Sequence, residues 1–211
     1  MTSMACLLSE GLDTLSLHLS EGQQQDLLDF IGLLGKWNKV YNLTALREPE
    51  QMLKQHILDC LAALPPLMKR YPDSCELLDV GAGGGLPSVV FAIACPQWRV
   101  TAVDAVAKKA AFIQTTSHSL GLLNLQGVHA RIEMMRGEYD VVTCRAFATL
   151  KDFCESSRHV LRKDGLWLSL KAKLTPEEIS EVPTGVRVDK IETIQVPGLP
   201  VERCLAWLKS E

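Results

Sequence analysis

The sequence predicts an α/β protein in which a mostly parallel β-sheet carries helices on both faces and follows an N-terminal helical segment. After Tyr71, short apolar runs alternate with stretches of helical length and period, which is typical of parallel strands joined by helices. Before Tyr71, apolar residues recur at helical intervals. We therefore expect a helical extension over residues 1–72 and an α/β domain over residues 73–211.

Two helices are expected in the extension. Residues 20–23 (Ser-Glu-Gly-Gln) have the spacing of a capping box, and apolar residues follow at helical intervals as far as Trp37. A second helix is expected over about residues 48–64, with Pro65 and Pro66 ending it. Residues 38–44 have no clean period and are expected to form a structured connection.

The α/β domain is expected to begin with five strands, at residues 76–80, 100–103, 125–129, 139–143 and 166–170. Helices are expected between them at 86–95, 107–120 and 150–161. The tail adds strand-like runs at 186–188, 191–196 and 204–208, with a hairpin turn at Pro197-Gly198. Ligands of such sheets bind at the carboxyl ends of the strands, where the strand order reverses. Residues that follow the strands are therefore the candidates for a site.

The composition is that of an ordinary globular protein, with 47% hydrophobic and 22% charged residues. There is no signal-peptide pattern and no apolar run of membrane-spanning length, so we expect a cytoplasmic protein without membrane contact. The seven cysteines form no CxxC pair. They are expected to be reduced, mostly buried thiols, and no metal site is expected.

The charge distribution indicates an RNA-facing side. The net charge of −3 argues against non-specific coating of nucleic acid. However, residues 36–70 hold six Lys/Arg against three acids, and residues 108–173 hold eleven against six. Solvated helix faces produce the same pattern, so both interpretations stay open. The candidate RNA-binding residues are Lys39, Asn42, Lys54, Lys108 and Lys109.

A glycine-rich loop at residues 81–87 (Gly-Ala-Gly-Gly-Gly-Leu-Pro) follows the first expected strand. Glycines let a backbone turn sharply and approach a ligand closely, and a helix beginning at about Leu86 would point its N–H groups into the same space. The loop does not match the G-x-G-x-x-G pattern of dinucleotide sites, because the third glycine of that pattern would have to replace Leu86 or Ser88. The G-x-G-x-G pattern resembles the S-adenosylmethionine (SAM) loop of class I methyltransferases.

Two further strand ends complete the expected cofactor site. Asp104 ends the second strand, where a carboxylate can accept hydrogen bonds from ribose hydroxyls. After the third strand, Ile132 is expected against the adenine face and Glu133 or nearby backbone at the adenine edge. An ordinary strand-to-helix cap explains this segment equally well. The candidate cofactor-binding residues at these positions are Gly81, Gly83, Gly85, Leu86, Asp104, Ile132 and Glu133.

Three stretches outside this generic pattern carry a specific resemblance. They are Trp-Asn-Lys-Val-Tyr-Asn-Leu-Thr at 37–44, His-Ile-Leu-Asp at 56–59 and Arg-Ala-Phe-Ala at 145–148. Together with the loop at 79–87, they resemble the RsmG (GidB) family of bacterial 16S rRNA guanine-N7 methyltransferases. The resemblance covers roughly residues 27–174, and a weaker similarity continues at 195–197 and 202–203.

The resemblance implies a Rossmann-like class I methyltransferase with a seven-stranded sheet. SAM is then the cofactor, and the substrate is one guanine of 16S rRNA close to the decoding centre, of the guanine-527 N7 type. The implied partner is 16S rRNA or the 30S subunit, and a monomer is expected. The implied cofactor contacts fall on Gly81, Leu86, the Ile132–Glu133 pair and Arg145. Departures from the usual pattern at Ser88, Ala105, Ala111 and Ala172 leave contact details open.

For methylation of guanine N7, the protein mainly has to position the two reactants. Guanine N7 is an unprotonated lone pair, so its methylation releases no proton and needs no general base. Arg145 is expected to hold guanine O6, a phosphate or the cofactor, since donation to N7 would block the nucleophile. His56 pairs with Asp59 in this interpretation, either to orient the helix or as a plain interhelix contact. Lys171 is either a phosphate ligand or a solvated lysine.

Two alternative functions remain at this point. The acidic net charge is compatible with a small-molecule methyltransferase. The absence of an identifiable general base is compatible with a non-catalytic module that binds SAM or RNA.

Overall fold

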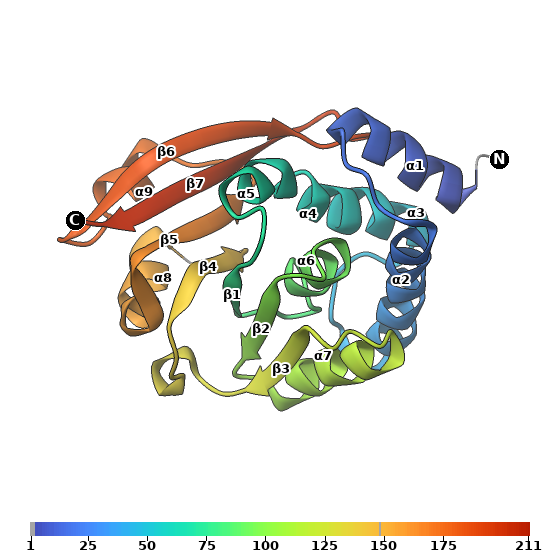
Figure 1. Cartoon of the computed structure of the whole chain (residues 1–211), viewed down its shortest axis with the longest axis horizontal. Coiled ribbons are helices and arrows are strands. Elements are labelled where there is room, and N and C mark those ends of the chain that lie inside the picture. Colours follow the sequence, from blue (N-terminus) through green and yellow to red (C-terminus); the bar gives the residue numbers. More distant parts are fainter. Residues whose placement is uncertain (1–2, 148) are drawn as a thin grey trace.

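The computed structural model describes residues 3–147 and 149–211 and contains a seven-stranded sheet (Figure 1). The strand order is β3-β2-β1-β4-β5-β7-β6, in which β1 to β5 are parallel and β7 is antiparallel to both of its neighbours. The order reverses between β1 and β4, which is the point where open α/β sheets bind ligands. The strands are β1 (Glu76–Val80), β2 (Arg99–Asp104), β3 (Leu125–His129), β4 (Tyr139–Arg145), β5 (Leu161–Lys171), β6 (Val186–Gln195) and β7 (Glu202–Ser210).

Helices cover both faces of this sheet, so the predicted Rossmann-like architecture is confirmed. None of those in the described ranges is long and apolar enough to cross a membrane. The N-terminal helical segment contains α1 (Met4–Leu15), α2 (Glu21–Tyr41), α3 (Pro49–Met52), a π-helical turn η1 (Leu53–Leu58), α4 (Asp59–Leu61) and α5 (Leu64–Arg70). The later helices are α6 (Ser88–Ala94), α7 (Ala107–Ser119), α8 (Leu150–Ser157) and α9 (Pro176–Ser180), with 3-10 turns η2 (Ile132–Met134) and η3 (Arg158–Val160).

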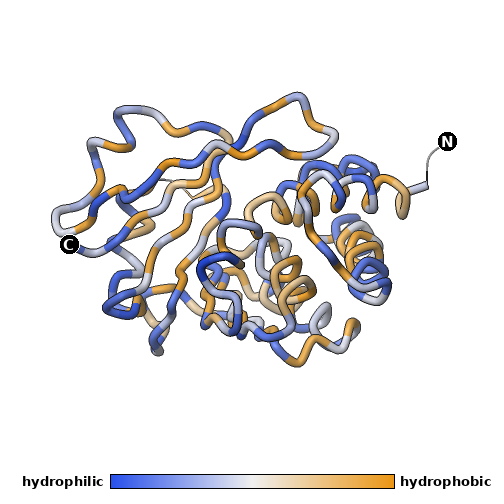
Figure 2. The backbone as a smooth tube through the Cα atoms, turned by 45° about the horizontal axis from the view of Figure 1, so that its top comes forward, coloured by the Kyte–Doolittle hydropathy of each residue, from blue (hydrophilic) through white to orange (hydrophobic). Residues whose placement is uncertain are grey.

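The strands bury apolar side chains on both faces, as parallel strands under two helical layers must. Leu77 joins a core shared with α1 to α7, whereas the next residue, Leu78, joins a second core beneath α8. The apolar segments of the strands and of the facing helices meet between the layers (Figure 2). The first core continues across the boundary predicted at residue 72, from Leu67 of α5 to Leu77 of β1. The division into an extension and a domain stays a prediction.

The capping box at Ser20 is confirmed, because its side chain accepts from Gln23 N and the Gln23 side chain accepts from Ser20 N. However, α2 continues to Tyr41, so residues 38–41 are helical rather than part of a connection. The reason is Asn38, a buried polar residue that interrupts the apolar period. Its side chain donates to Leu46 O and accepts from Thr44 N, and it thereby holds the segment that follows the helix.

The helix predicted over residues 48–64 is wrong in detail. It contains the π-helical turn η1 and ends at Leu61, before the prolines. Pro65 and Pro66 lie in the first turn of α5, where a missing N–H costs no intrahelical hydrogen bond. In the tail, the runs at 186–188 and 191–196 form one strand. A register irregularity between Val188 and Lys190 accounts for the predicted gap.

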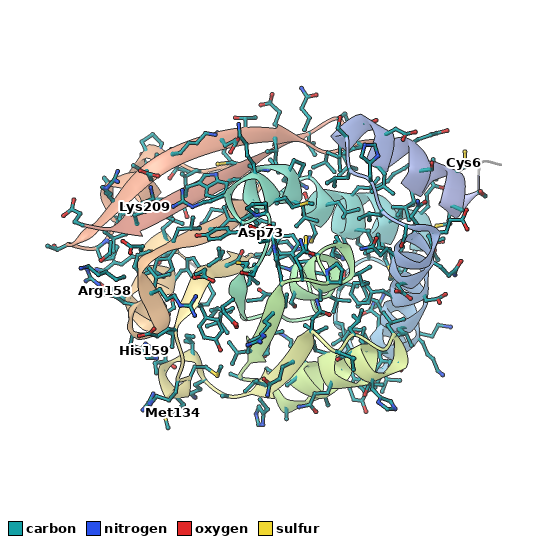
Figure 3. The ribbon with its side chains drawn as sticks, in the orientation of Figure 1. Cys6, Asp73, Met134, Arg158, His159 and Lys209 are labelled. Carbon is teal, nitrogen blue, oxygen red and sulfur yellow. The ribbon has the colours of Figure 1, made fainter. Side chains whose placement is uncertain are left out.

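Helix α1 is not predicted from the sequence, although Ser3 caps it and Leu8 and Leu12 are buried. The cysteines follow the expectation in part. Six of the seven are buried and all are free thiols, while Cys6 on α1 is exposed (Figure 3).

Candidate functional site

The glycine-rich loop leaves β1 and leans toward β2. Gly81 N and Ala82 N both donate to Val103 O, at 2.9 and 3.1 Å. Gly81 and Gly83 have φ angles of 69° and 57°, a region that side chains with a Cβ rarely adopt. A Cβ at Gly83 would meet only Gly81 O, at 3.8 Å. The loop therefore presents bare backbone to open space at this position.

Gly85 has a different role from Gly83. Its φ is 76°, and a Cβ there would lie 2.5 Å from Cγ2 of Val89 on α6. This glycine permits the loop to pack against the helix. The helix begins at Ser88, two residues later than expected. Leu86 N donates to Ala82 O, so fewer amide groups point into open space than the sequence suggested.

Asp104 fastens the glycine loop to the end of β2. Its Oδ2 accepts from Gly83 N at 2.9 Å and its Oδ1 from Val106 N at 2.8 Å. Lys109 Nζ lies 3.9 Å from Oδ2. Each carboxylate oxygen keeps a further lone pair, so the carboxylate can hold the loop and still accept a hydrogen bond from a ligand.

Asp79, a fully buried carboxylate in β1, is a site feature that sequence reasoning missed. Its Oδ2 accepts from Ser88 N at 3.1 Å, and among the described residues its Oδ1 has no partner. Burial raises the pKa of Asp79 to about 6, and the hydrogen bond from Ser88 N opposes this shift. A carboxylate inside an apolar run was the available signal.

The 3-10 turn η2 follows β3 and contains both adenine-site candidates. Ile132 is buried in the core beneath α8, while Glu133 is exposed. Ala130 N donates to Asp104 O, which ties this turn to the end of β2. The three strand ends with candidate cofactor residues therefore lie next to one another, in the order β3, β2, β1.

Arg145 ends β4 and contacts the helical segment through several of its donors. Its Nη1 lies 3.1 Å from Asp59 Oδ2 and 3.3 Å from Gln55 O, and its Nη2 lies 3.1 Å from His56 Nδ1. The expected pairing of His56 with Asp59 is not among the contacts of the described residues. Instead, the guanidinium of Arg145 bonds to both, because it offers separate donors to each.

His56 is held as a neutral imidazole. His56 Nδ1 lies near both Arg145 Nη2, at 3.1 Å, and Gln55 O, at 3.0 Å. Because Arg145 can only donate, Nδ1 accepts from it, and Nε2–H donates to Thr44 Oγ1 at 2.7 Å. Burial and the charge of Arg145 lower the pKa of His56 to about 4. The stretches 37–44, 56–59 and 145–148 are therefore linked through Thr44, His56 and Arg145. Ala148, the last residue of the third stretch, lies outside the described residues.

The low pKa of His56 predicts a pH-dependent contribution to stability. Its pKa is about 4 in the folded state, against about 6.5 in the unfolded chain, so the unfolded chain binds more protons between these values. The stability that His56 contributes is complete above pH 6.5 and falls toward pH 4. We expect wild type to lose about 2 kcal/mol relative to His56→Asn between pH 7 and pH 4.5. Urea unfolding of both proteins measures the difference, and a pH-independent difference would contradict the prediction.

A cavity of about 490 Å³ adjoins Arg145 at the carboxyl ends of β4 and β5. Phe147 lines it and lies 3.7 Å from the position of a Cβ on Gly81, so the cavity borders the glycine loop. Ala146, which lies between Arg145 and Phe147 in the chain, has a φ of 60°, a strained value for a residue with a Cβ. The cationic side chains in its lining are Arg145, Lys171, Lys173 and Arg203.

Lys171 lies at this cavity, as expected from its position after the fifth strand. It is largely buried and forms an ion pair with Glu178 of α9. It is therefore not a simple solvated lysine, and its charge is balanced within the protein.

The RNA-binding candidates fall in two places. Lys39 is exposed in the last turn of α2, and Lys108 Nζ lies 5.9 Å from the ring centre of Tyr41. Asn42, which follows α2, accepts a hydrogen bond from Arg47. Lys109 is on α7 beside Asp104. By contrast, Lys54 pairs with Glu50 beneath the turn at Gly198.

The end of α2 lies against the glycine loop. A Cβ on Gly84 would lie 3.2 Å from Leu34 and 3.7 Å from Leu43 O. Lys108, beside Tyr41, and Lys109, beside Asp104, stand in the first turn of α7 and therefore border the candidate cofactor site.

Comparisons with known proteins agree with this geometry. Residues 23–205 match the family described as rRNA small subunit methyltransferase G, GidB. The chain is 54% identical to ribosomal RNA small subunit methyltransferase G of Acidovorax sp. (strain JS42), covering 99% of this chain and 96% of that protein. It is 48% identical to the protein of the same name from Paracidovorax citrulli, covering 98% and 90%.

Solved structures with low identity share the fold. The ribosomal protein L11 methylase of Lactobacillus delbrueckii subsp. bulgaricus superposes with a TM-score of 0.54 at 15% identity, covering 73% of this chain and 77% of that chain. TrmN from Thermus thermophilus superposes with a TM-score of 0.53 at 16% identity, covering 75% and 53%.

Proposed function

We propose that this chain methylates N7 of one guanine in 16S rRNA, because it belongs to the family of rRNA small subunit methyltransferase G. Family membership makes the chain a SAM-dependent enzyme with an RNA substrate. The alternatives of a non-catalytic module and a small-molecule methyltransferase are therefore set aside. In this proposal the target is of the guanine-527 type, the substrate is the 30S subunit, and the enzyme acts as a cytoplasmic monomer.

The observation that carries the proposal is the position of the glycine loop beside the Arg145 cavity, where the strand order reverses. Because Gly81 and Gly83 have no Cβ, the space that a side chain would fill is left open, and a ligand can approach the backbone closely there. SAM fits this donor set, with its ribose at Asp104 and its adenine beside Ile132 and Glu133. The methionine end would then lie at Gly81–Leu86, near Arg145.

The acceptor guanine is proposed to enter the cavity lined by Arg145 and Phe147. SAM, when bound, supplies a methyl group carried on a sulfonium sulfur, and after the transfer this sulfur is a neutral thioether. The residues of this chain position the base for in-line attack, and N7 needs no proton removed. His56 fixes Arg145 and leaves the positive charge on the guanidinium.

Lys39, in the last turn of α2, and Lys108, in the first turn of α7, are proposed to bind RNA phosphates. Lys39→Glu and Lys108→Glu are expected to weaken binding of 30S subunits and flatten its salt dependence, because each removes a cation that displaces counterions. SAM affinity should stay unchanged. Filter binding between 50 and 200 mM salt tests this prediction. Lys190→Glu, on the remote strand β6, is the control, and equal losses for all three variants would contradict a specific surface.

The proposed activity is tested in cells by mass spectrometry of 16S rRNA with and without the gene. We expect one 7-methylguanosine to disappear when the gene is deleted and to return with a plasmid copy. An unchanged modification pattern would overturn the proposal.

A further inference from the structure

Arg203 reaches the same cavity from the C-terminal hairpin. Strand β7 is antiparallel to β5, so its first residues, rather than its last, lie at the carboxyl ends of the parallel strands. Cys204 pairs with Lys171 in the register, which places the neighbouring Arg203 at that edge. The turn before β7 packs on η1, where Gly198 faces the Lys54 side chain.

Asp59 joins this arginine to Arg145. Its Oδ1 accepts from Arg203 Nε at 2.8 Å and its Oδ2 from Arg145 Nη1 at 3.1 Å. The Asp59 side chain is only 8% exposed, whereas the two arginines are 24% and 20% exposed. A buried carboxylate requires such partners, since an unpaired buried charge is strongly unfavourable. Asp59 is therefore a shared anchor for two more accessible guanidinium groups.

The charges of this cluster do not cancel. One carboxylate faces two guanidinium groups, and His56 is neutral. Lys171 is balanced by Glu178, while Lys173 adds another cation to the cavity lining. The cavity therefore presents net positive charge, although the whole chain carries −3.

The hydrogen-bond donors of the two arginines are used differently. Arg145 directs Nη1 and Nη2 to the helical segment. Arg203 is anchored through Nε, and its Nη1 makes a long contact of 3.5 Å to Glu202 O. Within residues 3–147 and 149–211, its Nη2 has no hydrogen-bond partner. Nη2 of Arg203, and the second N–H of Nη1, are therefore available to an anionic ligand in the cavity.

We propose that Asp59 is a positioning residue that aims Arg203 at an RNA phosphodiester adjoining the target guanine, while Arg145 serves the methyl-transfer centre. This proposal rests on the proposed function. A planar guanidinium fork matches two phosphate oxygens and is suited to this contact. A base entering a cavity brings its own phosphodiester to the rim, and Arg203 and Lys173 both line this cavity.

The proposal predicts a separation of binding from chemistry. Arg203→Ala is expected to raise KM for 30S subunits about tenfold, to leave kcat within a few-fold of wild type, and to lower the salt slope of binding by about one. SAM affinity, measured by calorimetry, should not change. Asp59→Asn is expected to raise KM and also lower kcat, because it releases both arginines.

Arg187→Ala is the matched control, since Arg187 pairs in register with Lys209 at the other end of the hairpin (Figure 3). If Arg203→Ala does not fold, Arg203→Gln carries the same test, because its amide can still donate to Asp59. An unchanged KM, or a lower SAM affinity, in a folded Arg203 variant would overturn the proposal. Failure of wild type to methylate 30S subunits would instead overturn the proposed function.

Discussion

Arg145→Lys is expected to lose methyl transfer on the order of 100-fold, although the positive charge is kept. Arg145 bonds to Asp59, to Gln55 O and to His56 through two different nitrogens. A lysine ammonium is a single point on a flexible stem and cannot reproduce this planar arrangement. The side chain would then no longer be fixed between the helical segment and the cavity.

Single-turnover methylation of 30S subunits at saturating SAM measures this loss directly. Arg162→Lys is a suitable control, because Arg162 also forms an ion pair, with Asp140, but does not line the cavity. It should methylate at a rate close to wild type. A rate for Arg145→Lys within a few-fold of wild type would mean that the arginine does not position the reactants.

Gly83→Leu is expected to abolish SAM binding while the protein remains folded. The φ of 57° costs a residue with a Cβ about 1–2 kcal/mol, which a stable domain tolerates. The Cβ itself meets no close neighbour, so the leucine side chain extends into the open space beside the loop. That space is where the proposal places the cofactor.

Gly121→Leu provides a matched control for this variant. Gly121 has a φ of 64° and open space around its Cβ position, but it lies in the turn before β3, away from the carboxyl ends of the strands. Both variants should lose similar stability, and only Gly83→Leu should lose heat of binding with SAM or S-adenosylhomocysteine. Wild-type affinity in Gly83→Leu, or tight NAD binding by the parent protein, would contradict the proposed cofactor site.

The parts of the fold with a local signal were predictable from the sequence. The alternation of apolar runs indicates the parallel strands, and the failed dinucleotide register at Leu86 and Ser88 distinguishes the glycine loop from a phosphate site. Asp104 is a candidate because it stands at a strand end, and its role as a cofactor ligand stays a prediction. The structure adds that this carboxylate holds the loop through Gly83 N.

The parts that depend on tertiary contacts were not predictable. Arg203 lies at the start of a strand, and only the antiparallel direction of β7 brings it to the ligand edge. The π-helical turn η1 has no periodic signature, yet Gln55 O and His56 within it, and Asp59 just after it, all contact Arg145. For Asp79 the only local signal is a carboxylate within an apolar run, and its partner Ser88 lies beyond a loop, so the sequence does not show what the carboxylate contacts.

Methylation of 30S subunits from a strain lacking the gene is a direct test of the proposed activity. Purified protein and SAM carrying a labelled methyl group would be incubated with these subunits, and the 16S rRNA would be digested and analysed by mass spectrometry. We expect about one labelled 7-methylguanosine per 16S rRNA, within a single fragment of the decoding-region loop, and none with Gly83→Leu. Labelling of another atom or another fragment, or no labelling of the rRNA, would contradict the proposed activity.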